Sequence, residues 1–147
     1  MTTIAVRDGV MAADTMGHSS EKLCRSKKLF RVSNGDVIGF SGVWIDGKLF
    51  IDWYDKGADR DMPPPWRTQG DEKVNFNALV LTADGIYEWS WELVADRVLD
   101  DFWAIGSGSP AALAAMHCGR NAQEAVYIAM EIDPYTGGDV ETMEVVK

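Results

Sequence analysis

Thr2 directly follows Met1, and this position could give its hydroxyl group unusual chemistry. A threonine hydroxyl is a poor nucleophile near neutral pH and needs an adjacent base. If Met1 is removed, the free α-amine lies on the same residue as the hydroxyl. Such an amine has a pKa of about 7.7–8.0 in short peptides, so it can accept a proton at physiological pH. Thr2 alone would then supply both the nucleophile and the base.

Three further residues have the right types and positions to assist Thr2. The stretch "TTIAV-RDG-VMAAD" is typical of a tight hairpin, which would bring Asp14 back beside Thr2. Lys28, in "SKKLF", could stabilise a developing alkoxide and pair with Asp14. Gly42, in "GFSG", would let a substrate carbonyl approach a backbone N–H, as an oxyanion site requires. Taken singly, a carboxylate at the end of a strand or a lysine pair at the start of one is more often merely solvated.

Hairpins must position these residues, and the turn residues mark three of them. Each turn is an Asp-Gly or Asn-Gly dipeptide between apolar strand-like segments, at residues 8–9, 34–35 and 84–85. Residues 15–26 are polar and indicate a loop. Near-helical spacing of apolar residues over 43–57 predicts one short amphipathic helix that stops at Gly57. Three consecutive prolines then impose an extended path on residues 58–73.

The last third of the chain predicts a strand, two helices and a final strand. "FWAIGSGS" indicates the strand and a turn. In the first helix Ser109 is the expected N-cap, Pro110 takes the first helical position and Gly119 ends it. In the second, Asn121 caps and Glu124 bonds back to the cap. With "VETMEVV" as the final strand, this order favours an α+β domain whose sheet layers are covered by helices.

Composition limits the classes of function. A chain of 147 residues suits one domain, and a net charge of −9 argues against a nucleic-acid partner. No stretch approaches the roughly 18 apolar residues of a membrane span, and the first 15 residues are not typical of a secretory signal. The two cysteines form no disulfide framework and have no ligand spacing with the two histidines. We therefore expect a cytoplasmic protein without a metal site or cofactor.

Six stretches in order resemble the β-type proteasome subunits and the related peptidase subunit of bacterial ATP-dependent proteases. They are "TTIAV", "VMAADT", "SKKLFRV", "IGFSG", "AIGSGSPAALAA" and "DPYTGG". These relatives are N-terminal nucleophile hydrolases. The resemblance implies one domain over residues 1–147, folded as a four-layer αββα sandwich. The helical region after "FSG" is reduced, because the family normally has two long helices where this sequence predicts one short helix.

The resemblance also assigns roles to residues by their place in these stretches. Thr2 matches the nucleophile, Asp14 and Lys28 match the active-site aspartate and lysine, and Gly42 matches the oxyanion glycine. The residues that match the polar group beside the N-terminal amine are Ser107, Asp133 and Thr136.

Three residues match positions that contact the substrate. Phe30 and Phe40 fall where the family lines the pocket for the side chain before the scissile bond, which suggests an apolar or small substrate side chain. They could equally be inward-facing core residues. His18 either bonds the substrate through its ring nitrogens or is simply exposed to solvent.

The leading hypothesis is a threonine-type endopeptidase acting on peptides or unfolded proteins. The resemblance implies a homo-oligomer, and the reduced helical region leaves a ring and an ATPase partner open. Trp89 and Trp91 in "EWSWE" are the expected subunit contact, because they would alternate on one strand and face the same side. Two alternatives are an inactive assembly subunit on the same scaffold and an amidase that acts on a small molecule.

Overall fold

The computed structural model describes residues 2–19, 22–66 and 76–145 and contains three antiparallel sheets. The first has the strand order β10-β1-β2-β11. Its strands are β1 (Thr3–Arg7), β2 (Val10–Asp14), β10 (Phe102–Gly106) and β11 (Val140–Glu144). The turn between β1 and β2 has φ values of +53° at Asp8 and +74° at Gly9, as a two-residue hairpin turn requires. The predicted first hairpin is therefore present.

The second sheet has five strands in the order β5-β6-β7-β8-β9, which is also their order along the chain. The strands are β5 (Leu29–Arg31), β6 (Val37–Gly42), β7 (Phe76–Leu81), β8 (Ile86–Ser90) and β9 (Ala95–Arg97). The hairpins predicted around residues 34–35 and 84–85 are both confirmed. The short edge strand β9 was not expected from the sequence.

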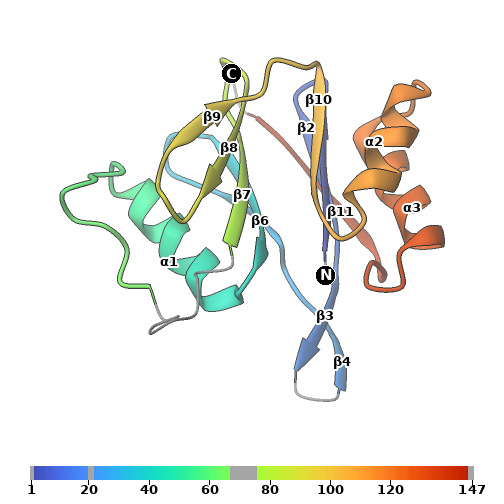
Figure 1. Ribbon diagram of the computed structural model, residues 1–147, viewed down its shortest axis with the longest axis horizontal. Helices are drawn as coiled ribbons and strands as arrows, with labels where there is room; N and C mark the ends of the chain where they lie inside the picture. The colour runs from blue at the N-terminus through green and yellow to red at the C-terminus, as the bar shows by residue number, and fades with distance from the viewer. Residues whose placement is uncertain (1, 20–21, 67–75, 146–147) are drawn as a thin grey trace.

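Alternation along β1 shows how the layers are built. Ile4 and Val6 pack between the two sheets, whereas Ala5 faces the helices α2 (Ser109–His117) and α3 (Ala122–Ile132). The other face of the second sheet packs against α1 (Trp44–Asp55) through an aromatic cluster that includes Phe50. Figure 1 shows the resulting order of layers, with α1 on one side, two sheets in the middle and α2 and α3 on the other side.

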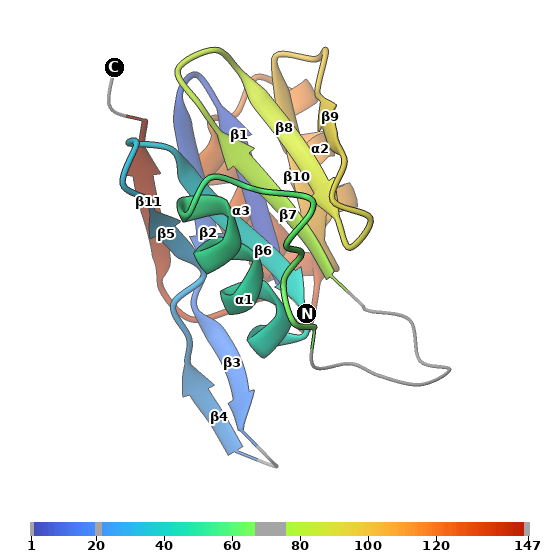
Figure 2. The same ribbon diagram turned by 90° about the vertical axis from the view of Figure 1, so that its left-hand side faces the viewer.

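A two-stranded hairpin extends away from these layers. Its strands are β3 (Met16–Ser19) and β4 (Lys22–Arg25), and it projects from one end of the sandwich in Figure 2. The loop expected over residues 15–26 is therefore wrong. The sequence signal was missing because the hairpin has no buried face: all four residues of β4 are exposed, so no apolar alternation is required.

The helices match the sequence with one correction. The spacing over 43–57 does form α1, and α3 has the predicted capping box between Asn121 and Glu124. The N-cap of α2 is Gly108 rather than Ser109, which is the first helical residue. Gly108 is required there, because a Cβ atom on it would lie only 1.9 Å from Thr3 Oγ1.

The expected alternation of Trp89 and Trp91 on one strand is wrong. Trp89 packs in the aromatic cluster beneath α1, with its ring 5.5 Å from that of Phe50. Trp91 lies beyond the end of β8 and is 44% exposed. The two side chains therefore do not share one face of a strand, because β8 ends at Ser90.

Candidate active site

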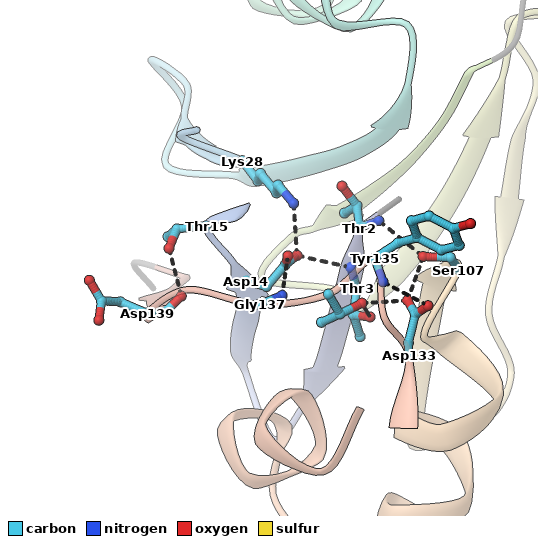
Figure 3. A network of polar contacts seen from close by, with 11 residues as sticks. Thr2, Thr3, Asp14, Thr15, Lys28, Ser107, Asp133, Tyr135, Gly137 and Asp139 are labelled. Carbon is cyan, nitrogen blue, oxygen red and sulfur yellow. Dashed lines mark hydrogen bonds and ion pairs between the residues drawn. The ribbon is translucent and has the colours of Figure 1, made fainter. Parts of the chain in front are cut away.

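Asp14 is the centre of a buried polar group at the end of β2 (Figure 3). It is fully buried and accepts three hydrogen bonds. Oδ1 accepts from Lys28 Nζ at 2.9 Å and from the Thr3 N–H at 3.0 Å, and Oδ2 accepts from the Gly137 N–H at 3.1 Å. A buried carboxylate needs such partners, because leaving it unpaired would cost several kcal/mol, on the order of 3–5.

Strand register explains how three distant segments meet at Asp14. In the first hairpin Ile4 pairs with Ala13, which places the start of β1 beside the end of β2. On the other side of β2, Val140 pairs with Asp14, so the turn that precedes β11 also reaches this point. Lys28 lies directly before β5 in the second sheet. The predicted approach of Lys28 to Asp14 is thus present as an ion pair between the two sheets.

The ammonium of Lys28 is held in an environment that disfavours its charge. Burial lowers the pKa of Lys28 below its ordinary value of 10.5, and the attraction and hydrogen bond from Asp14 only partly oppose this effect. Lys28 therefore releases its proton more readily than an exposed lysine does.

A second polar network reaches Thr2 from the opposite direction. The Thr2 backbone nitrogen donates to Ser107 Oγ at 3.3 Å. Ser107 and Thr136 each donate to Asp133 Oδ2 at 2.6 Å, and the Tyr135 N–H donates to Oδ1 at 3.1 Å. Partial burial raises the pKa of Asp133, but these hydrogen bonds outweigh that effect and hold the pKa below its usual value. Asp133 thus remains a carboxylate that only accepts hydrogen bonds.

Thr3 connects the two networks, although sequence reasoning did not select it. Its backbone N–H donates to Asp14, and its Oγ1 lies 2.7 Å from Thr136 Oγ1. Because Thr136 gives its own hydrogen to Asp133, Thr3 is the donor in this contact. The sequence indicated Thr3 only by its position, because it follows Thr2 at the start of the first strand.

A cavity of about 470 Å³ opens beside Thr2. Thr2 and Lys28 both line it, and both are only 7% exposed. Gly42 lines it from the end of β6 and has a φ of +111°, a backbone conformation that favours glycine. The other lining residues are Met16, Gly17, His18, Cys24, Ser26, Lys27, Phe40, Ser41 and Trp44.

Of the three residues predicted to contact the substrate, two line the cavity and one does not. His18, on β3, is exposed and lines the cavity. Phe40 lines it too and is 5% exposed. Phe30 is not among the lining residues; its ring stacks on Phe40, with 6.0 Å between the ring centroids and 10° between the planes. Sequence reasoning missed Trp44, which enters the cavity wall because α1 begins directly beyond β6.

Two kinds of feature are absent from the described parts of the chain. Over residues 2–19, 22–66 and 76–145, no group of three or more His, Cys, Asp and Glu side chains could hold a metal ion. Within the same ranges, no helix is both long enough and apolar enough to cross a membrane.

No family model and no curated protein matches the sequence. Solved structures do match the fold. BPH from Thiobacillus denitrificans in complex with epoxomicin is 22% identical, with a TM-score of 0.72 over 99% of both chains. A second structure of that BPH has a TM-score of 0.71, covering 99% of this chain and 98% of BPH.

Eukaryotic HslV from Trypanosoma brucei is also similar, with 22% identity, a TM-score of 0.69 and coverage of 98% of this chain and 99% of HslV. At this identity the likeness establishes the fold. The expected fold class, a four-layer αββα sandwich, is therefore confirmed along nearly the whole chain.

Proposed function

We propose that this chain is a threonine-type peptidase of the proteasome-like kind, which hydrolyses peptide bonds after removal of Met1. One observation carries the proposal: Thr2 lines a cavity beside the buried Lys28–Asp14 pair, while its nitrogen contacts Ser107. The shared fold with BPH and HslV supports a hydrolase of this kind.

In the first step Thr2 Oγ1 attacks the carbonyl carbon of the substrate, and the free α-amine of Thr2 accepts the hydroxyl proton. Ser107 supports this role of the amine. Because Ser107 gives its hydrogen to Asp133, it presents only lone pairs to the Thr2 nitrogen. The amine can then donate to Ser107 and still keep its own lone pair for the proton of the hydroxyl.

Two groups stabilise the charge that forms during the attack. The Lys28 ammonium, held by Asp14, favours the alkoxide form of the Thr2 hydroxyl. The backbone N–H of Gly42, which lines the cavity, is assigned to the oxygen of the tetrahedral intermediate, where a fixed donor stabilises negative charge.

In the second step the intermediate collapses. The C–N bond of the substrate breaks, and the proton held by the α-amine passes to the leaving nitrogen. An ester between Thr2 Oγ1 and the acyl group remains. Water then attacks this ester and gives a proton to the α-amine. The bond between the acyl carbon and Thr2 Oγ1 breaks, the α-amine returns the proton to Oγ1, and the carboxylic acid leaves, which restores Thr2. These two steps require no cofactor or metal ion.

The proposed substrate is a peptide or an unfolded protein, and the proposed assembly is a homo-oligomer. A ring and an ATPase partner belong to the same proposal. The chain has the single helix α1 of twelve residues between β6 and β7, among the residues that the structure describes there. Native mass measurement will separate a ring from a smaller assembly.

The test compares wild-type protein with Thr2→Ala and Thr142→Ala. Thr142 is an exposed threonine on β11 and is the matched control. Intact mass spectrometry determines whether Met1 is removed, and fluorogenic peptides measure turnover. Epoxomicin, which is bound in the BPH complex, serves as a probe whose retention on the protein is read as added mass.

We expect wild type and Thr142→Ala to lack Met1, turn over peptide and retain epoxomicin. Thr2→Ala should do neither of the last two. Retained Met1 without turnover would contradict the proposal and favour an inactive assembly subunit. Turnover of small amides but not of peptides would favour the amidase alternative.

A further inference from the structure

We propose that the cavity selects an acidic side chain at the substrate residue whose carbonyl Thr2 attacks. This inference rests on the proposed peptidase function and specifies its substrate class. It replaces the apolar preference that the two phenylalanines alone suggest.

The charge of the cavity differs from that of the protein. The chain has 23 acidic residues and a net charge of −9, yet among the residues that the structure describes, none that lines the cavity is Asp or Glu. The lining includes Lys27, Lys28 and His18. Lys28 is neutralised by Asp14, which lies behind it and is fully buried. Lys27 therefore supplies a cation that can face a ligand.

A second cation, Lys48, is not itself a lining residue but lies beside Trp44, which is one. The Lys48 ammonium is 4.2 Å from the ring centroid of Phe30 and 5.8 Å from that of Trp44, which lines the cavity. The Lys27 ammonium is 5.4 Å from the Phe30 ring. Two ammonium groups thus converge on one aromatic ring. In the described part of the chain, neither forms an ion pair with a carboxylate.

The fold fixes Lys48 beside Trp44. Trp44 and Lys48 are four residues apart on α1, so they occupy the same face of the helix. That helix lies close against Phe40 because residue 47 is glycine: a Cβ atom there would be 2.2 Å from the Phe40 ring. Lys48 is half-buried, which limits the positions that its ammonium can take.

An acidic side chain matches both parts of this wall. The methylene groups of a glutamate can pack on Phe40 and Trp44, and its carboxylate can accept charge-assisted hydrogen bonds from Lys27 and Lys48. A leucine would fill the apolar part but leave two ammonium groups facing it without an anion. A lysine would add a third positive charge.

Binding is measured on Thr2→Ala protein, so that the result does not depend on turnover. The probes are acetylated tripeptide amides that end in Glu, Gln, Leu or Lys and are otherwise identical. Lys27→Met and Lys48→Met are made in the same background. Lys56→Met is the control, because Lys56 is an exposed lysine on the same helical segment and pairs with Asp52. Turnover of the matching fluorogenic peptides is measured with the Thr2 protein.

We expect the Glu peptide to bind about tenfold more tightly than the Gln peptide, the value of one charge-assisted hydrogen bond. Lys48→Met and Lys27→Met should each reduce that ratio, and Lys56→Met should leave it unchanged. Lys48→Glu should reverse the preference toward the Lys peptide.

Equal binding of the Glu, Gln and Leu peptides would overturn the selectivity, and turnover of all three would leave the peptidase proposal standing. Preferential binding of the Glu peptide without turnover of any peptide would instead support the selectivity and overturn the peptidase function.

Discussion

Two lysine–carboxylate pairs of equal length have very different surroundings. Lys28 Nζ and Lys56 Nζ each lie 2.9 Å from an aspartate oxygen, of Asp14 and Asp52 respectively. The side chains of the first pair are 8% and 0% exposed, and those of the second are 74% and 63% exposed. The first pair joins two sheets, whereas the second spans one turn at the end of α1. The distance between the charged atoms therefore does not by itself determine how much an ion pair contributes to stability.

The surroundings move the two lysine pKa values in opposite directions. Burial lowers the pKa of Lys28 despite the attraction of Asp14. The hydrogen bond and charge of Asp52 raise the pKa of the exposed Lys56. A buried pair lacks the water that would solvate either member alone, so each member depends on the other. In an exposed pair, water replaces a lost partner.

Removal of one lysine at a time gives the largest predicted difference. Lys28→Met should lower turnover about a hundredfold to a thousandfold, because a cation beside the forming alkoxide is lost. It should also lower the free energy of unfolding by about 3 kcal/mol, because Asp14 stays buried without its ion-pair partner. Lys56→Met should leave turnover unchanged and lower the free energy of unfolding far less, because water solvates an exposed partner. Peptide turnover and urea unfolding measure the two effects.

An equal loss of unfolding free energy in Lys28→Met and Lys56→Met would show that the buried and the exposed ion pair contribute equally to stability. Loss of stability in Lys28→Met without loss of turnover would leave Lys28 as a structural residue only.

Alkaline titration should separate the pairs by the sign of its effect. Because the folded-state pKa of Lys28 lies below 10.5, the folded protein loses this proton before the unfolded chain does. The cost of burying the charge is present below the folded pKa and disappears as the pH rises toward 10.5, so the Lys28 contribution to stability increases over that window. Turnover should fall over the same window, because the ammonium is lost.

Lys56 should behave in the opposite way. Its raised pKa gives a contribution that is present below 10.5 and is lost as the pH rises through the folded value. The measurement is urea unfolding of wild type, Lys28→Met and Lys56→Met from about pH 8 to about pH 11, with turnover rates recorded alongside. If the free energy of unfolding of wild type and of Lys28→Met changed in parallel with pH, the lowered pKa of Lys28 would be contradicted.

The sequence predicted those parts of the fold that depend on local backbone chemistry or on one buried face. The Asp8-Gly9 turn and the Asn121 capping box are local, and both are present. The β3–β4 hairpin was missed because all four residues of β4 are exposed, so no apolar alternation is required there. Trp89 and Trp91 were misplaced because the end of β8 depends on its pairing with its neighbours, which the sequence does not display.

Hairpin geometry predicted only part of the candidate site. A tight first hairpin returns Asp14 to the start of β1, where its carboxylate accepts a hydrogen bond from the Thr3 backbone N–H. The position of Thr3 against Thr136 needs the packing of the turn before β11 across the first sheet. The lysine cluster around Phe30 likewise needs α1 placed on the second sheet, so Lys48 carried no signal in the sequence.

The smallest predicted effect tests whether exposure alone makes a polar contact weak. Asn121 and Arg120 are adjacent and exposed, and both contact Glu124 at the start of α3. Asn121 Oδ1 accepts from the Glu124 backbone N–H at 2.8 Å, a donor without a partner inside the helix, whereas the Arg120 side chain contacts the Glu124 carboxylate. Asn121→Ala should therefore cost about 1 kcal/mol in urea unfolding, and Arg120→Ala should have no measurable effect. Equal losses in both variants would mean that exposure outweighs the need of the backbone N–H for a partner.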